Sequence, residues 1–133
     1  MCIRDRHTGD ATHDYGAGNG GEKTIRIKGI FPRVFFSFTG DREKILSVEQ
    51  WGTNQWASMQ SAFHGASNLA INASDTPDLS GVTDMSLMFS GATAFNQDIG
   101  GWDTSNVTRM DSMFSGATAV SYTHLTLPTI YSV

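Results

Sequence analysis

Apolar residues recur with a fixed period along the second half of the chain. The segment from Val82 to Ala94 reads VTDMSLMFSGATA, and the segment from Val107 to Ala119 reads VTRMDSMFSGATA. The apolar positions and the Gly-Ala pair are kept, while the polar positions between them change. A fixed period of about 25 residues is typical of repeat proteins in which each coil stacks on the coil before it.

A fainter third copy begins at Trp56, which aligns with Val82 one period later. The inward positions shared by the three copies form the predicted repeat core. Met85 and Met110 are expected to lie in one column of this core, and Phe89 and Phe114 in another. The methionines could also suggest a soft-metal site, but their helical spacing with phenylalanine favours core filling. The core positions are Trp56, Met59, Phe63, Leu69, Val82, Met85, Met88, Phe89, Phe95, Ile99, Val107, Met110, Met113 and Phe114.

Within each copy the core positions are three or four residues apart, which predicts one or two turns of helix. Gly65, Gly91 and Gly116 occur where a helix is expected to end. The short apolar stretches at 69–71 and 95–99 are candidate ladder strands. The sequence therefore predicts an α+β solenoid over 51–119, in which each coil contains a short strand and a short helix.

Residues 7–50 predict a small antiparallel β lead-in that caps the N-terminal end of the repeats. The run at 24–28 alternates apolar and polar residues, and the apolar residues at 34, 36 and 38 share one face of a second expected strand. A third short strand is expected at 45–48. Two copies and a degenerate third form a marginal stack, so a cap is expected here and more coils are expected beyond Ala119 in the natural protein.

The two ends of the chain are related at the nucleotide level. The first residues, MCIRD, can be encoded by ATG-TGT-ATA-AGA-GAC, and the reverse complement of that string translates to VSYTH, the sequence at 120–124. The string resembles a transposase adapter used in sequencing libraries. We therefore expect 1–6 and 120–133 to be translated adapter and exclude them from the fold prediction.

Composition narrows the possible functions. The formal charge is −4, and it becomes −5 when the residues at 1–6 are left out. An acidic repeat segment without lysine argues against nucleic-acid binding. Cys2 lies in an excluded end, so no cysteine-based metal site or thiolate is expected. No apolar run is long enough to span a membrane. The charged residues after Trp56 are Asp75, Asp78, Asp84, Asp98, Asp103, Asp111 and Arg109.

The run FNQDIGGWDTSNVTRMDSMF at 95–114 closely resembles the BspA-like leucine-rich-repeat surface proteins, whose repeat also occurs in many mycoplasma lipoproteins. The resemblance covers roughly 44–119. It implies leucine-rich-repeat-type coils, a bacterial cell-surface or secreted location and adhesion to a protein ligand. The sequence THDY at 12–15 and the strand at 24–27 weakly resemble the end of a PKD-like β-sandwich.

Some residues could carry chemistry. Asp78 and Asp103 occupy the same place in successive copies and could stack into a calcium ladder, although aspartate before serine is also a common turn and capping pattern. Trp102 takes the place of a proline in the previous copy, so it could be exposed and stack on a sugar. His13 and His64 have no partner at metal-ligand spacing. Neither family brings catalytic residues, and no cofactor is expected.

The sequence therefore predicts a monomeric, non-enzymatic module that binds a protein ligand and mediates adhesion outside the cell. Two alternatives remain open. The repeats could be a structural spacer in a large surface protein, or they could form a carbohydrate-binding accessory module with the PKD-like lead-in.

Overall fold

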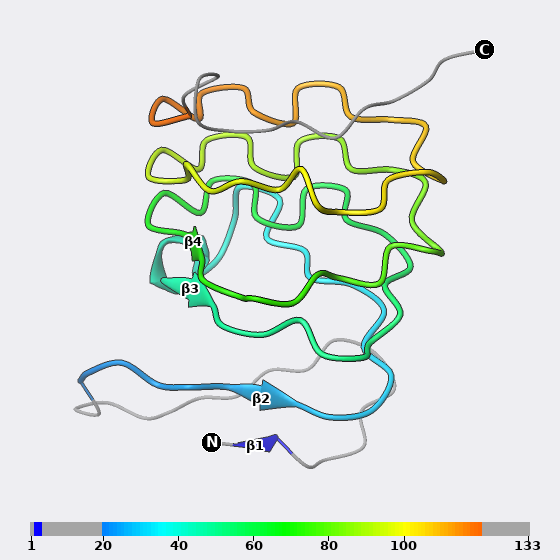
Figure 1. Ribbon diagram of the computed structural model, residues 1–133. Helices are drawn as coiled ribbons and strands as arrows, with labels where there is room; N and C mark the ends of the chain where they lie inside the picture. Colours follow the sequence, from blue (N-terminus) through cyan, green and yellow to red (C-terminus); the bar gives the residue numbers. More distant parts are fainter. Residues whose placement is uncertain (1, 4–19, 121–133) are drawn as a thin grey trace. The chain divides into compact units, whose positions relative to one another are not determined.

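The computed structural model describes residues 2–3 and 20–120 and divides into two compact units, Met1–Phe31 and Pro32–Val133 (Figure 1). Turns and extended segments make up most of the described chain. The few regular elements are short. They are β1 (Cys2–Ile3), β2 (Arg26–Ile27), the 3-10 turn η1 (Arg42–Lys44), β3 (Ser47–Val48) and β4 (Ala70–Ile71).

The first unit contains one parallel strand pair. Cys2 of β1 is opposite Arg26 of β2, and Ile3 is opposite Ile27. The side chain of Ile27 is 51% exposed, so β2 buries little apolar surface. Part of the predicted adapter segment at 1–6 thus pairs with β2. The adapter interpretation concerns the DNA and stays a prediction, and residues 121–133 lie outside the described residues.

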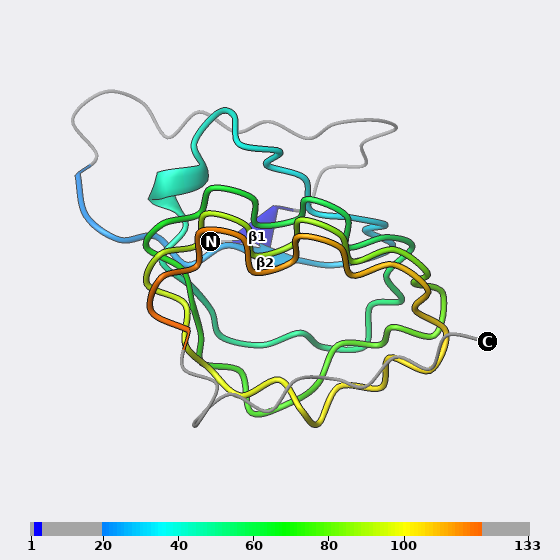
Figure 2. The same cartoon turned by 90° about the horizontal axis from the view of Figure 1, so that it is seen from above.

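In the second unit, successive copies of the repeat form loops that stack through backbone hydrogen bonds (Figures 1 and 2). Over 59–65 and 85–91, every second N–H donates to a carbonyl of the next copy. In the first tier the pairs are Met59 to Asp84, Ser61 to Ser86, Phe63 to Met88 and Gly65 to Ser90, at 2.7 to 3.2 Å. In the second tier they are Met85 to Arg109, Leu87 to Asp111, Phe89 to Met113 and Gly91 to Ser115, at 2.7 to 3.1 Å.

The N–H groups between these donors close tight turns inside each copy. Met88 donates to the carbonyl of Met85, and Ser90 donates to the carbonyl of Leu87. Leu87 itself has φ of +58°, and Ser61 and Ser112 in the neighbouring copies have φ of +52° and +54°. A residue with positive φ cannot continue a right-handed helix. The chain therefore makes a series of turns, and half of its amides remain available for the next copy.

The prediction of an α+β solenoid with leucine-rich-repeat-type coils of short strand and short helix is wrong. The described residues contain no α-helix, and of the expected ladder strands only the one at 69–71 is present, as β4. Consecutive turns place apolar residues inward at intervals of three and four, as a helix does. The spacing therefore predicted the inward-facing residues correctly and the backbone conformation incorrectly.

The prediction of an antiparallel lead-in is also wrong, because both strand pairs are parallel. Val48 of β3 is opposite Ile71 of β4, so the third expected strand pairs with the first repeat. The second expected strand is absent, since Ser37 and Phe38 adopt positive φ of +46° and +61° and form a turn. The N–H of Phe38 instead donates to the carbonyl of His64 at 3.0 Å.

The core of the second unit is an aromatic stack surrounded by aliphatic and methionine side chains. The rings of Phe63, Phe89 and Phe114 are nearly parallel, with successive centroids 5.9 and 5.8 Å apart. Phe95 lies against Phe89 at 4.1 Å. Because the first three rings come from equivalent positions in successive copies, the same side chain provides both the core of its own loop and the contact with the next loop.

We expect Phe89→Ala to lower the free energy of unfolding by about 3–5 kcal/mol, because the ring is fully buried and its removal leaves a cavity in the stack. Urea unfolding measured by circular dichroism would give this value. Phe35→Ala is the control: that ring is 55% exposed and lies under the guanidinium of Arg33, so its loss should cost about 0.5–1 kcal/mol. Equal effects of the two changes would contradict the proposed role of the stack.

Candidate functional site

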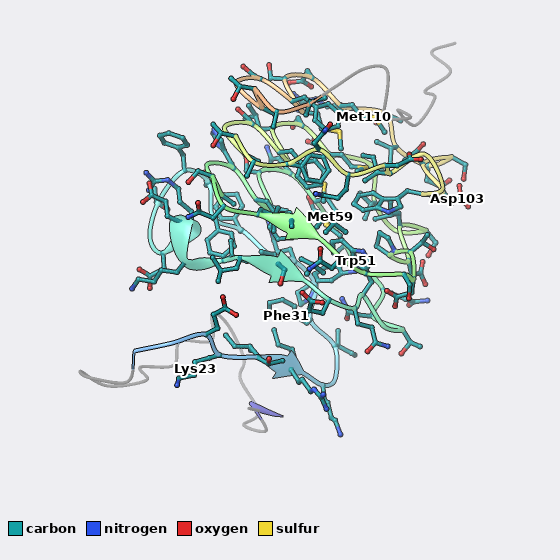
Figure 3. The ribbon with its side chains drawn as sticks, turned by 60° about the vertical axis from the view of Figure 1, so that its left-hand side comes forward. Lys23, Phe31, Trp51, Met59, Asp103 and Met110 are labelled. Atoms are coloured by element: carbon teal, nitrogen blue, oxygen red, sulfur yellow. The ribbon has the colours of Figure 1, made fainter. Side chains whose placement is uncertain are left out.

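The most regular polar feature is a column of aspartate turns at the outer edge of the loops. Asp78 accepts hydrogen bonds from the backbone N–H and the hydroxyl of Ser80, at 3.0 and 2.6 Å. Asp103 lies at the equivalent place one repeat later and accepts from the N–H of Ser105 at 3.0 Å (Figure 3). These bonds lower the pKa of both carboxyl groups below the ordinary value, with the Ser80 and Ser105 side chains as the largest causes.

The calcium ladder has no additional support from this geometry. The carboxylates of Asp78 and Asp103 accept hydrogen bonds from their own turns, and Asp78 also accepts one from the side chain of Gln55 in the previous copy. Within residues 2–3 and 20–120, no group of three or more histidine, cysteine or acidic side chains is placed to hold a metal ion. The turn interpretation accounts for both residues as the sequence pattern suggested.

Polar side chains on the surface also bond to the copy before their own. The amide of Asn106 donates to the carbonyl of Ser80 at 2.9 Å. The hydroxyls of Thr93 and Thr108 each donate to a carbonyl of the previous copy at 3.2 Å. These bonds fix the side chains in repeated positions along the stack. The surface is therefore an ordered array of hydroxyl, amide and carboxylate groups.

Arg109 is the only lysine or arginine between Trp56 and Val120. It contacts Asp111 at 3.1 Å and Asp84 of the previous copy at 3.5 Å. Asp111 is the main reason that the pKa of Arg109 is raised. Burial raises the pKa of Asp84, but the bonds from Ser86 and the charge of Arg109 outweigh it, so the net pKa is lowered. The sequence of this segment offers no basic counterpart for its other acidic groups.

Asp75 was not singled out by the repeat, because the next copy has no acidic residue at the equivalent position. Its two carboxylate oxygens accept the N–H groups of Trp51 and Gly52, at 3.0 and 2.8 Å. The bond from Trp51 is the largest cause that lowers the pKa of Asp75. Asp75 thus fixes the turn in which Trp51 enters the core.

Gln97 is a second residue that sequence reasoning missed. Its side-chain oxygen accepts the N–H of Ile71 in β4 at 3.1 Å. The side chain therefore replaces the backbone carbonyl that a third ladder strand would have offered. The only sequence signal is that Gln97 lies one repeat after Ile71.

Trp102 does not have the exposure that a sugar-stacking role would need, because its side chain is only 8% exposed. Its ring packs edge-on against Trp51 with centroids 5.4 Å apart, and Trp51 packs in the same way against Trp56 at 5.9 Å. This arrangement is a favoured geometry of buried aromatic pairs. The three tryptophans therefore close one side of the core.

The predicted core positions are all buried except Met110 and Phe114 of the last copy, which are partly exposed. Figure 3 shows Met59 inside the loops and Asp103 at their outer edge. His64 is partly buried and packs against Phe38, with ring centroids 5.1 Å apart. His13 lies outside the described residues. The structure thus places Asp103 at the outer edge of the loops and buries Met59, Met85, Met88 and Met113 within them.

These features define a repeat protein with an apolar stack inside and an acidic, ordered polar surface outside. The model of a family described as Mycoplasma protein of unknown function, DUF285, matches residues 32–125, so the chain belongs to that family. This agrees with the resemblance to mycoplasma repeat proteins. No curated protein sequence and no solved structure matches the chain. Over the described residues, no helix has the length and apolar character to cross a bilayer.

We expect Asp75→Ala to lower the free energy of unfolding by about 1–2 kcal/mol at neutral pH, because two N–H groups lose their acceptor and solvent replaces it only in part. The folded pKa of Asp75 is lowered, so its contribution is present at neutral pH and is lost as the pH falls below about 4. The difference between wild type and variant should therefore shrink in acid. Chemical unfolding at pH 7 and pH 3 would measure it.

Asp75→Asn is the matched control, since it keeps an acceptor oxygen and removes the charge. It should destabilise less than Asp75→Ala at pH 7. A wild type whose advantage over Asp75→Ala is the same at both pH values would contradict the assignment.

Proposed function

We propose that this chain is a non-enzymatic binding module of a bacterial cell-surface or secreted repeat protein, and that it mediates adhesion to a protein ligand. The observation that carries the proposal is the ordered polar surface. Side chains such as Asn106 and Thr108 are held at fixed positions by bonds to the previous copy. The resemblance to BspA-like surface proteins supports the proposal, and the match to a family of unknown function is consistent with that resemblance.

Order at the surface favours binding for an entropic reason. A flexible side chain loses rotamer freedom when a partner immobilises it, which costs about 0.5–1.5 kcal/mol for each side chain. Asn106 and Arg109 already make contacts that restrict them. These side chains therefore lose less rotamer entropy when a partner binds than free side chains would lose.

The charge of the surface indicates what kind of protein would bind. Asp98 and Asp103 are both exposed, both belong to the same loop, and no lysine occurs after Lys44. A basic patch on a partner would be attracted to this region, and the attraction would be screened by salt. We therefore propose a protein ligand with a positively charged contact surface.

The experiment is binding of the chain to immobilised collagen and laminin at low and physiological salt, measured by surface plasmon resonance. The double variant Asp98→Asn, Asp103→Asn should bind about two- to tenfold more weakly, because two exposed charges are lost. The turns should survive, since an asparagine oxygen can still accept the N–H groups of Gly100 and Ser105.

The matched control is Asp41→Asn, Glu43→Gln, which removes two exposed charges from the same unit at η1, away from the aspartate turns. It should leave binding unchanged. If the chain binds neither protein, adhesion to matrix proteins is wrong, and the spacer role would be favoured. Saturable binding to a glycan array without binding to either protein would favour the carbohydrate-binding role.

A further inference from the structure

The large apolar side chains that the structure exposes all lie in one stretch of the sequence, before the repeats. Between residues 47 and 120, all of which the structure describes, no large apolar side chain is exposed. Single exposed apolar residues are normal on protein surfaces, so their confinement to one stretch is the informative observation. The exposed residues are Ile25, Ile27, Ile30, Phe35, Phe38 and Leu46, whose exposed fractions run from 43% to 96%.

Most of the basic residues lie in the same stretch. Residues 20–46 contain six lysines and arginines against three acidic residues, which gives a formal charge of +3. Residues 47–120 contain one arginine against seven acidic residues, which gives −6. The chain is therefore divided into a basic part that exposes apolar side chains and an acidic part that does not. The six basic residues are Lys23, Arg26, Lys28, Arg33, Arg42 and Lys44.

In the first unit the two properties alternate along the segment that contains β2. Ile25, Arg26, Ile27 and Lys28 follow one another, and all four are exposed. Successive side chains of an extended segment point to opposite sides. The two isoleucines therefore share one side, and the two basic residues share the other. Ile30 follows two residues after Lys28 and is 96% exposed.

In the second unit each exposed ring is paired with a guanidinium group. The guanidinium carbon of Arg33 lies 4.1 Å from the ring centroid of Phe35, and that of Arg42 lies 4.6 Å from the ring centroid of Phe38. Both rings are about half exposed. Each pair thus presents an apolar ring and a positive charge at the same place on the surface.

A partner for this stretch must be apolar and negatively charged at once. A nucleic acid or an acidic polysaccharide would neutralise the basic groups but would leave Ile25, Ile27 and Ile30 in water. An anionic phospholipid layer meets both needs, because its acyl region accepts apolar side chains and its phosphate groups attract lysine and arginine. The same layer would repel the acidic repeats.

We propose that residues 20–46 form a membrane-contact surface that binds an anionic phospholipid layer. The contact is peripheral, with isoleucine and phenylalanine side chains at the boundary between the headgroups and the acyl chains. This surface is separate in sequence from the aspartate turns to which the protein ligand is assigned, so either proposal can fail while the other holds. It leaves the acidic repeats to bind their ligand.

The test is flotation of the full chain with vesicles of phosphatidylcholine, with and without about one-third phosphatidylglycerol, at low and physiological salt. The chain should bind the anionic vesicles at least about tenfold more tightly than the neutral ones, and salt should weaken this binding. The triple variant Lys23→Gln, Arg26→Gln, Lys28→Gln should bind at least about tenfold more weakly, because each basic residue near an anionic surface contributes about fivefold.

A second triple variant, Ile25→Ser, Ile27→Ser, Ile30→Ser, distinguishes lipid from other anions. It keeps every charge, so its retention on heparin beads should equal that of the wild type. Its binding to anionic vesicles should fall at least about fivefold, because apolar area no longer leaves water. The three side chains are exposed, so the near-ultraviolet circular dichroism of the buried tryptophans should not change.

The control is Asp98→Asn, Asp103→Asn, which should leave vesicle binding intact even where it weakens binding to a protein ligand. Equal binding to neutral and anionic vesicles would overturn the proposal. Full vesicle binding by the isoleucine variant would also overturn it, since the partner would then be recognised by charge alone. Self-association of the chain that the isoleucine changes abolish, without vesicle binding, would assign the surface to a second copy instead.

Discussion

The backbone hydrogen bonds between successive copies are the constraint on which the second unit depends. The N–H groups of one loop must lie opposite the carbonyls of the next loop, so the loops must have the same shape. A common shape requires a residue with a left-handed backbone conformation at the middle of each loop. These residues are Ser61, Leu87 and Ser112 in the three successive copies. A positive φ at these non-glycine residues costs of order 1 kcal/mol each. This energetic cost is tolerated because the turn leaves alternate N–H groups free to bond to the next loop.

The same constraint explains the column of glycines at 65, 91 and 116. All three have positive φ, and a Cβ added at Gly91 would lie 3.4 Å from the Cα of Gly65. At Gly65 an added Cβ would lie 2.5 Å from the ring of Phe38, which covers this column at the N-terminal end. Backbone bonds of 2.7 Å at Gly65 and Gly91 are the shortest of their tiers. Close approach of the loops is therefore greatest where no side chain separates them.

The sequence was sufficient to predict the repeat, its period and the inward residues, because inward positions in a stack must recur from copy to copy. It was not sufficient to predict the backbone. Apolar residues at intervals of three and four fit a helix and also fit consecutive turns. The residue type of Leu87 does not predict a left-handed backbone conformation. The aspartate turns were predictable from local pattern. Asp75 and Gln97 were not, because each accepts backbone N–H groups at a single place that the repeat pattern does not mark.

The charged residues on the surface of the stack are subject to a separate electrostatic constraint. Equivalent residues lie one above another, so like charges in one column would repel. Asp84 is paired with Arg109 across a parallel bridge, and the change of sign between the copies converts a repulsion into an ion pair. Asp78 and Asp103 keep the same sign, but each carboxylate accepts donors from its own turn. Exposed columns can thus vary in chemistry from copy to copy while the stack beneath them stays constant, which is the property that a binding surface on a repeat protein requires.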